Sequence, residues 1–91
     1  MRIGGAIAAA IAEVDARRSQ YLRYRDEILP RAIEVENMAD DAYRLGQTGI
    51  AAYILALQAT REVRLQSLQT ETELRVALAD LERAMGSALP P

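Results

Sequence analysis

Apolar residues in the first half of the chain recur at a seven-residue spacing, accompanied by a second series three residues further on. The two series are Ile7, Val14, Tyr21, Ile28, Val35 and Ala42, and Ala10, Tyr24, Met38 and Leu45. This alternation is typical of a helix that packs along one seam, as in a coiled coil. Pro30 lacks a backbone donor and clashes with the preceding turn, so we predict a kink or break there.

The second half of the chain, from Ile50 to Met85, contains no Gly or Pro and predicts one unbroken helix ending at Gly86. Its large apolar residues are spaced nearer to eleven residues per three turns than to strict heptads, which predicts nearly straight packing. These residues are Ile54, Leu57, Leu65, Leu68, Leu74, Val76, Leu78, Leu81 and Met85. Pro90 and Pro91 follow the predicted end of the helix.

One stretch between the two halves favours the end of a helix. Gly46 suits the left-handed conformation that terminates a helix, and the hydroxyl of Thr48 can cap the next one. The sequence therefore predicts an all-α, long antiparallel hairpin in a single domain, without any segment for a β-barrel. Its first arm covers residues 5–45, its turn 46–49 and its second arm 50–86.

A hairpin bent near position 47 pairs residues whose numbers add up to about 95. Apolar partners at this register are Leu45 with Ile50, Met38 with Leu57, Ile28 with Leu68, Tyr21 with Leu74, Val14 with Leu81 and Ile11 with Met85. Opposite charges also meet: Glu34 with Arg61, Arg31 with Glu62, Arg25 with Glu71, Arg23 with Glu73 and Glu13 with Arg83. We therefore predict a seam that stabilises the hairpin and charge pairs that select its register.

Two helices of about forty residues cannot enclose a core of their own. The pattern leaves Leu22, Leu29, Ile33 and Val63 on the outer faces of the arms. Further helices must cover these faces, so we expect association into a bundle of four or more helices, by self-association or within a larger protein.

The composition excludes most kinds of catalytic site. The 91 residues include no Cys, His or Lys, which removes thiolates, imidazole bases, Schiff-base lysines and the usual zinc ligands. Asp40 and Asp41 are neighbours on a helix and face different ways, so a solvated surface is favoured over a cation site. We expect no enzymatic activity, no cofactor and no bound metal.

The charge and hydropathy of the chain do not favour binding to nucleic acid or lipid. The net charge is −2, and no apolar run approaches the roughly 20 residues that span a bilayer. Five Arg are interleaved with Tyr21 and Tyr24, as on nucleic-acid surfaces, but acidic residues lie among them. Pairing between helices is the favoured role of these Arg, and nucleic-acid binding is not expected.

Several stretches together resemble a known family. Tyr43-x-x-Gly46 is followed by an apolar run from Ile50 to Leu57 and by a long heptad-like arm that ends Leu-Ala-Asp-Leu-Glu-Arg-Ala-Met-Gly at 78–86. This arrangement is similar to the C-terminal part of TolC-type outer-membrane efflux proteins. The stretch Arg-Asp-Glu-Ile-Leu-Pro-Arg-Ala at 25–32 is most similar to the branch that serves heavy-metal resistance-nodulation-division pumps.

The resemblance implies a role in passive export. Proteins of that family are trimers with a β-barrel in the outer membrane and a long helical duct through the periplasm, which works with an adaptor protein and an inner-membrane pump. This chain would be a periplasmic part of the duct, either a fragment of a longer channel or a short gene product that kept only the hairpin. The hairpin end would meet the adaptor through Tyr43, Arg44, Gly46, Gln47, Thr48 and Gly49.

The resemblance fails at one place. Many relatives carry carboxylates a few residues after the Gly of the Tyr-x-x-Gly motif, where this chain has Ala52 and Leu55, so an acidic ring at the entrance is not implied. The alternative interpretation is a free-standing coiled-coil module that forms a homo-oligomeric helix bundle, with a regulatory or RNA-binding role as its sharpest version.

Overall fold

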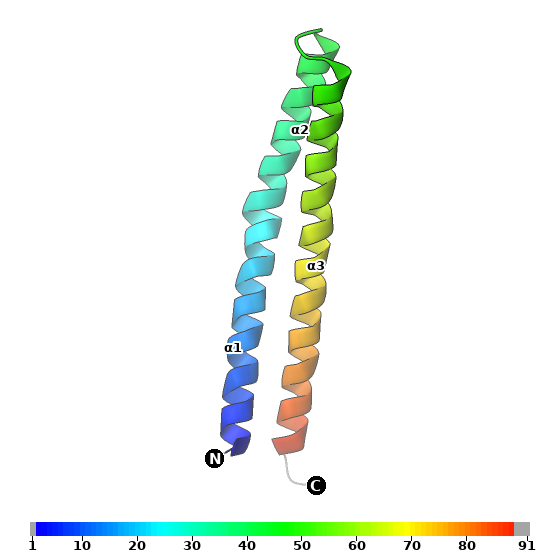
Figure 1. Ribbon diagram of the computed structural model, residues 1–91. Coiled ribbons are helices and arrows are strands. Elements are labelled where there is room, and N and C mark those ends of the chain that lie inside the picture. Colours follow the sequence, from blue (N-terminus) through cyan, green and yellow to red (C-terminus); the bar gives the residue numbers. More distant parts are fainter. Residues whose placement is uncertain (1, 89–91) are drawn as a thin grey trace.

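The structure is a computed structural model that describes residues 2–88, and it is a single helical hairpin (Figure 1). The first arm consists of α1 (Arg2–Arg23), a π-helical turn η1 (Tyr24–Ile28) and α2 (Leu29–Arg44). The second arm is α3 (Ile50–Ala88), which runs back antiparallel to the first. The principal extents are 68 × 15 × 15 Å, and the start of α1 and the end of α3 lie side by side at the open end of the hairpin. The predicted all-α hairpin is confirmed.

The first arm continues through Pro30 without a break, and the irregularity lies just before it. Pro30 is the second residue of α2 and directly follows the π turn, so its missing backbone donor falls where the regular hydrogen-bond ladder is already interrupted. The N–H of Leu29 donates to the carbonyl of Tyr24, five residues back, so the backbone widens into one π-helical turn. The break that was one of the two predicted outcomes at Pro30 does not form, and a π turn accommodates the proline within one helical arm.

The π turn shifts the phase of the apolar series in the first arm. Ile7, Val14, Tyr21 and Ile28 are half-buried, as a seam residue should be, but Val35 is 54% exposed. A π turn inserts one residue into the helix, so the side that faces α3 moves one position along the chain. Beyond it, the half-buried residues of α2 include Ala32, Glu36, Ala39 and Asp40, whereas Val35, Met38 and Leu45 are exposed.

The seam of α3 consists mostly of small residues at strict heptad spacing. Its half-buried or buried members are Tyr53, Ala56, Thr60, Val63, Ser67, Thr70, Leu74, Ala77, Leu81 and Ala84. Of the large apolar residues expected to mark the seam, only Leu74 and Leu81 lie in it. The predicted eleven-residue spacing was therefore wrong, because the small residues that let the arms approach closely carry the real pattern. The helix also passes through Gly86 and ends at Ala88.

The predicted register was wrong for most pairs. Cross-arm contacts join residues whose numbers add up to 93 near the tip, at Asp40 and Tyr53, but to 90 beyond the π turn, at Arg17 and Glu73. The single residue that the π turn inserts accounts for one of these three units. Among the apolar pairs, only Tyr21 with Leu74 and Val14 with Leu81 consist of two half-buried residues. Leu45, Ile50, Met38, Leu57, Leu68, Ile11 and Met85 are all exposed.

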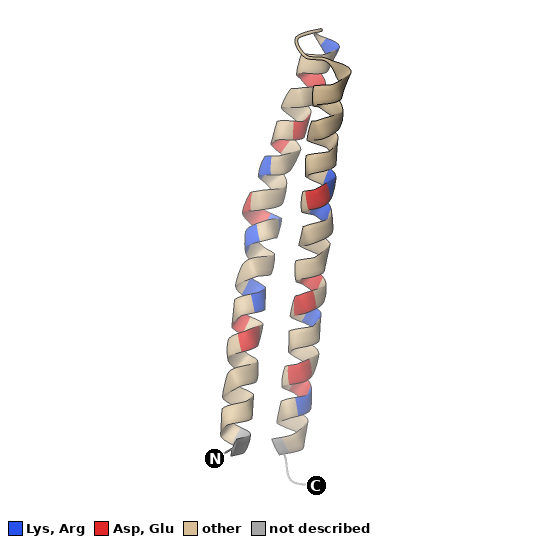
Figure 2. Cartoon of the chain, viewed as in Figure 1, with Lys and Arg blue, Asp and Glu red and all other residues tan. Residues whose placement is uncertain are grey.

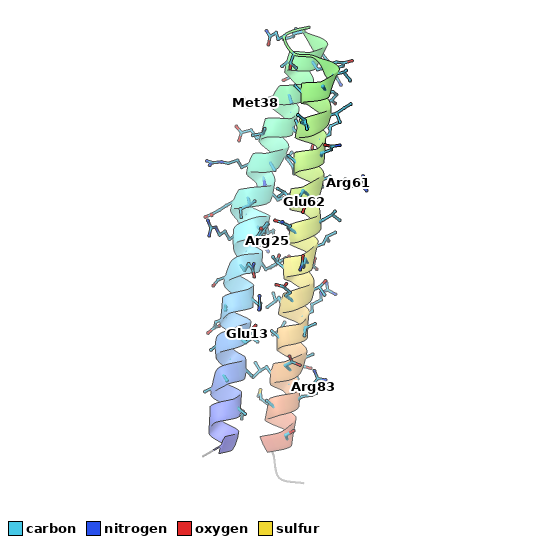
Figure 3. The ribbon with its side chains drawn as sticks, viewed as in Figure 1. Glu13, Arg25, Met38, Arg61, Glu62 and Arg83 are labelled. Atoms are coloured by element: carbon cyan, nitrogen blue, oxygen red, sulfur yellow. The ribbon has the colours of Figure 1, made fainter. Side chains whose placement is uncertain are left out.

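The five predicted charge pairs are absent from the described residues. Five of the six ion pairs found within residues 4–87 instead join neighbours along one arm, as Arg17 does with Glu13 and Arg75 with Glu71. Figure 3 shows Arg61 directed away from the first arm. Arg17 is the exception, because its Nη1 atom also lies 3.1 Å from Glu73 on the opposite arm. Charges of both signs alternate along the arms (Figure 2), and exposed pairs of this kind contribute little to stability.

The apolar residues that remain uncovered differ from those expected. Leu22, Leu29, Ile33 and Val63 are half-buried. The uncovered side chains, each between 37% and 72% exposed, belong to the outer faces of α2 and α3, to Leu45 in the turn and to Ile11 in α1. They include Val35, Met38, Leu45, Ile50, Ile54, Leu55, Leu57, Leu65, Leu68, Val76, Leu78 and Met85. Ala77 is the only buried hydrophobic residue among those that the structure describes.

Candidate functional site at the hairpin tip

The turn at the tip is fixed by a hydrogen-bonded helix end. Gly46 has a φ of +72°, in the left-handed region that glycine enters without cost. The N–H of Gln47 donates to the carbonyl of Ala42 at 2.8 Å, and the N–H of Gly46 donates to Tyr43 at 3.0 Å. These are the two bonds of a Schellman motif, which satisfies carbonyls that the end of α2 would otherwise leave free. The left-handed role predicted for Gly46 is confirmed.

A cluster of four side chains joins the two arms directly behind this turn. The rings of Tyr43 on α2 and Tyr53 on α3 stack with centroids 5.0 Å apart and planes 20° apart. The Tyr53 hydroxyl donates to Oδ1 of Asp40 at 2.8 Å, and Arg44 Nε lies 3.0 Å from Oδ2 of the same carboxylate. Tyr43, Tyr53, Asp40 and Arg44 form the tip cluster, which ties three residues of the first arm to one of the second.

The electrostatics of the tip cluster favour a neutral Tyr53. The hydrogen bond to Asp40 is the main cause that raises the pKa of the Tyr53 hydroxyl, and partial burial and the negative charge of Asp40 act in the same direction. Arg44 opposes the shift by its positive charge. The phenol therefore stays protonated and keeps donating to the carboxylate over the physiological pH range.

Beyond the tip cluster, the end of the hairpin is apolar and almost uncharged. No acidic or basic residue occurs between Arg44 and Arg61, and Figure 2 shows this uncharged length of α3. Leu45 is 72% exposed and Leu55 65% exposed, while the Arg44 side chain is 75% exposed. The tip therefore offers an apolar surface with a single accessible cation.

The six residues expected to bind a partner occupy this end of the hairpin in different ways. Tyr43 and Arg44 belong to the tip cluster, while Gly46 and Gln47 contribute backbone geometry. Gly49 accepts the N–H of Tyr53 at 3.3 Å and thereby starts α3. Thr48 is half-buried, but its hydroxyl makes none of the side-chain hydrogen bonds found within residues 4–87, so the predicted cap does not form.

Sequence reasoning missed Tyr53 and the role of Asp40. Two features of the sequence could have pointed to Tyr53. It occupies the first position of the heptad pattern of α3, and it is the sole aromatic residue of that helix. Ala52 and Leu55, which stand where relatives of the suggested family carry carboxylates, are both exposed.

Comparison with protein-family models, with curated proteins and with solved structures yields no match to this chain. Within the described helices, no segment has the length and hydropathy needed to cross a membrane. Residues 2–88 likewise contain no group of three or more acidic side chains placed to hold a metal ion. The hairpin, its tip and its uncovered surfaces are therefore the features from which a function can be inferred.

Proposed function

We propose that the chain is a segment of the periplasmic helical duct of a TolC-type outer-membrane efflux channel, and that it acts in passive export without catalysis. The observation that carries this proposal is the Tyr43-x-x-Gly46 motif at the closed end of a long, narrow hairpin. In this position Gly46 makes the turn and Tyr43 braces the two arms, which suits a tip that has to keep its shape while it meets another protein.

The uncovered surface supports a role inside a larger helical assembly. The chain exposes 6915 Å², whereas a compact monomer of its 10.0 kDa mass would expose about 5,200 Å². The excess, about 1,700 Å², is about twice the roughly 800 Å² that each partner contributes to a protein–protein interface of standard size. The seam between the two arms of the hairpin encloses little apolar surface. Most of the stability of a duct segment would therefore come from other helices packed against the outer faces of the hairpin.

In this proposal the tip contacts a periplasmic adaptor protein that links the channel to an inner-membrane pump. The apolar end with its single accessible cation, Arg44, supports contact through shape and hydrophobic burial. The exposed Ala52 and Leu55 argue against an acidic, ion-selecting ring at this level of the duct. Selection of the transported substrate would then belong to other parts of the assembly.

Photo-crosslinking in the source cells tests the proposal. A photoreactive amino acid replaces Gln47, which is exposed at the tip, or Leu65, which is exposed near the middle of α3. We expect the probe at position 47 to capture an adaptor-type periplasmic protein, and the probe at position 65 to capture other helices of the channel. The proposal is wrong if position 47 captures no periplasmic protein and the chain fractionates away from the cell envelope.

A second candidate function is a free-standing coiled-coil module that forms a homo-oligomeric helix bundle. It is favoured by the same excess of exposed area, which further copies of the chain could cover. Crosslinks between copies at both positions, with no other protein captured, would support this alternative. Its RNA-binding version is tested by a gel-shift titration over salt, because binding through Arg side chains must weaken as the salt concentration rises.

A further inference from the structure

Two sets of residues in the first arm compete for the side of α2 that faces α3. The seven-residue series continues past the π turn as Ile28, Val35 and Ala42, followed three residues later by Arg31, Met38 and Leu45. The residues that face α3 in the structure lie one position further on, and those that are half-buried are Leu29, Ala32, Glu36 and Ala39. The π turn therefore decides which of the two sets forms the seam.

The set that occupies the seam includes carboxylates. Glu36 and Asp40 are both half-buried in α2. Asp40 is held by Tyr53 and Arg44, whereas Glu36 takes part in none of the ion pairs and side-chain hydrogen bonds found within residues 4–87. Covering part of a carboxylate without a partner is unfavourable, so contacts elsewhere must hold α2 in this phase.

The other set borders an apolar groove that has room for it. The groove lies between the two arms and has a volume of about 260 Å³. Ile28, Arg31 and Val35 of the displaced set line it on the first arm, opposite the small side chains of Ala56 and Ala59 on α3. Val35, although 54% exposed, therefore lies at the rim of a space that the seam leaves unfilled.

The π turn that separates the two arrangements is not locked by packing. None of its five residues, Tyr24–Ile28, is buried. Surface grooves border it, and Ile28 lines three of them. What favours the π turn is Pro30, because a proline inside a regular α-helix clashes with the preceding turn and kinks the helix.

We propose that α2 is a two-position device, with a second phase in which the π turn reverts to a proline-kinked α-helix. The residue that the π turn accommodated then passes into the connection at 45–49, which belongs to no helix. As a result α2 rotates by one residue, or about 100°. Val35 and Met38 turn toward α3, and Glu36 turns toward solvent. We call the observed arrangement the Val35-out phase and the other the Val35-in phase.

The apolar contacts of the two phases nearly balance. Rotation of α2 covers Val35 and Met38, which are 54% and 64% exposed, but it uncovers Leu29 and Ile33, which are half-buried. Because aliphatic side chains of similar size are exchanged, the buried apolar area changes little. The polar groups and the proline therefore decide between the phases.

The polar contacts and Pro30 favour the Val35-out phase overall. In this phase Pro30 needs no kink, and the hydroxyl of Thr60 donates to the carbonyl of Ala32 across the seam at 3.2 Å. The Val35-in phase gives up both and gains the hydration of Glu36. The Val35-out phase is thus the more populated one, by a margin that a partner or a single substitution can overturn.

The phase of α2 also decides whether the tip cluster forms. Asp40 and Tyr43 contact Tyr53 in the Val35-out phase, and rotation of α2 carries both away from it. A helix that packs on Val35 and Met38 binds the Val35-out phase alone, since the other phase hides them. Contact on the side of α2 therefore stabilises the tip cluster, which couples lateral packing to the shape of the tip.

The two phases are a property of the hairpin itself, so they go beyond the proposed duct function and do not depend on it. A failed adaptor crosslink at position 47 leaves the equilibrium between the phases untouched. Conversely, a hairpin locked in the Val35-out phase could still serve as a duct segment.

Disulfide trapping on the intact chain, at a concentration where it is monomeric, tests for both phases. Glu36→Cys/Ala56→Cys reports the Val35-out phase, because the two numbers add up to 92, as those of Ala32 and Thr60 do. Val35→Cys/Ala56→Cys reports the Val35-in phase, in which position 35 replaces position 36 opposite Ala56. We expect the 36–56 disulfide to form quickly and the 35–56 disulfide more slowly, from the minor phase.

Two variants of the first arm should shift the equilibrium in opposite directions. Pro30→Ala removes the reason for the π turn, so the 35–56 disulfide should form about tenfold faster or more. Deletion of Asp26 removes the inserted residue and leaves a regular helix in the Val35-out phase, so the same disulfide should form about tenfold more slowly or less. The 36–56 disulfide in the deletion variant is the matched control and should form at least as fast as before. Circular dichroism checks that helix content is unchanged.

The tip provides an independent measurement of the same rotation. In chains labelled with 3-fluorotyrosine, the 35–56 disulfide should shift the fluorine NMR signals of Tyr43 and Tyr53 more than that of Tyr21, whereas the 36–56 disulfide should leave them in place. The proposal is overturned if the 35–56 disulfide does not form, if deletion of Asp26 does not slow it, if Pro30→Ala does not accelerate it, or if the trapped chain keeps the tip signals of the wild type.

Discussion

α1 and α2 carry the same seven-residue apolar series but use it differently. In α1 the series faces α3, and Val14 and Tyr21 lie in the seam. In α2 the same series continues through Val35, but that side chain points to solvent, because the π turn at Tyr24–Ile28 has rotated the helix by one residue. The comparison teaches that a regular sequence pattern marks a seam only as long as the helix remains regular.

The difference between α1 and α2 is tested most directly by placing the same charge at equivalent positions on both sides of the π turn. Val14→Asp buries part of a carboxylate in the seam and should lower the free energy of unfolding by about 1–3 kcal/mol. Val35→Asp, three heptads further on, should change it by less than about 0.5 kcal/mol. Urea denaturation followed by circular dichroism, at a concentration where the chain is monomeric, measures both. Equal losses would mean that the phase shift is wrong.

The end of α2 depends on the left-handed residue at the turn. Gly46→Ala should lower the free energy of unfolding by about 1–2 kcal/mol, because φ is +72° there. No atom lies within 4 Å of the added Cβ, so the cost is conformational and involves no clash. Gly86→Ala is the control. Gly86 lies within α3, has the same open surroundings without a positive φ, and thermal unfolding should show little change or a small gain.

The middle of the seam is tied by a hydroxyl that spans the two arms. Thr60 is 2% exposed, and its Oγ1 lies 3.2 Å from both the Ala32 carbonyl across the seam and the Ala56 carbonyl in its own helix. Thr60→Val should therefore cost about 1 kcal/mol. Thr72→Val removes a matching bond to Leu68 within one helix at an exposed position and should cost much less. Equal effects in chemical denaturation would contradict the cross-arm role.

The smallest expected effect is the pH dependence of the tip cluster. The hydrogen bond to Asp40 raises the pKa of Tyr53 above its ordinary value of 10.0, so the folded state favours the protonated phenol. Its contribution is fully present below pH 10 and is lost as the pH rises through the raised pKa. The melting temperature of the wild-type chain should therefore fall more steeply above pH 10 than that of Tyr53→Phe. Parallel curves would show that Tyr53 is not coupled to folding.

The fold could be predicted from the sequence because its main signals are local. The absence of Gly and Pro from residues 50–85 indicated one long helix, and Gly46 indicated the turn. The register could not be predicted in the same way. Pro30 signalled an irregularity in the first arm. Whether the backbone forms a break or a π turn there depends on what packs against it. The two outcomes turn different sides of the helix between residues 29 and 45 toward the second arm.

The candidate site was predicted only in part, for a related reason. Tyr43 and Gly46 stand out within one short motif, whereas Tyr53 acquires its role from Asp40, thirteen residues away on the other arm. The small residues of the α3 seam were equally hard to recognise, since Ala, Ser and Thr give a weak hydropathy signal beside the exposed Leu and Ile of the same helix.

The π turn also affects which surface such a chain exposes when its length changes during evolution. Adding or removing one codon ahead of residue 29 leaves composition, helix content and turn nearly unchanged, yet decides whether Val35 and Met38 are hidden or displayed. A change of length by a single residue can thus expose or bury an apolar surface in one mutational step, without any substitution on that surface.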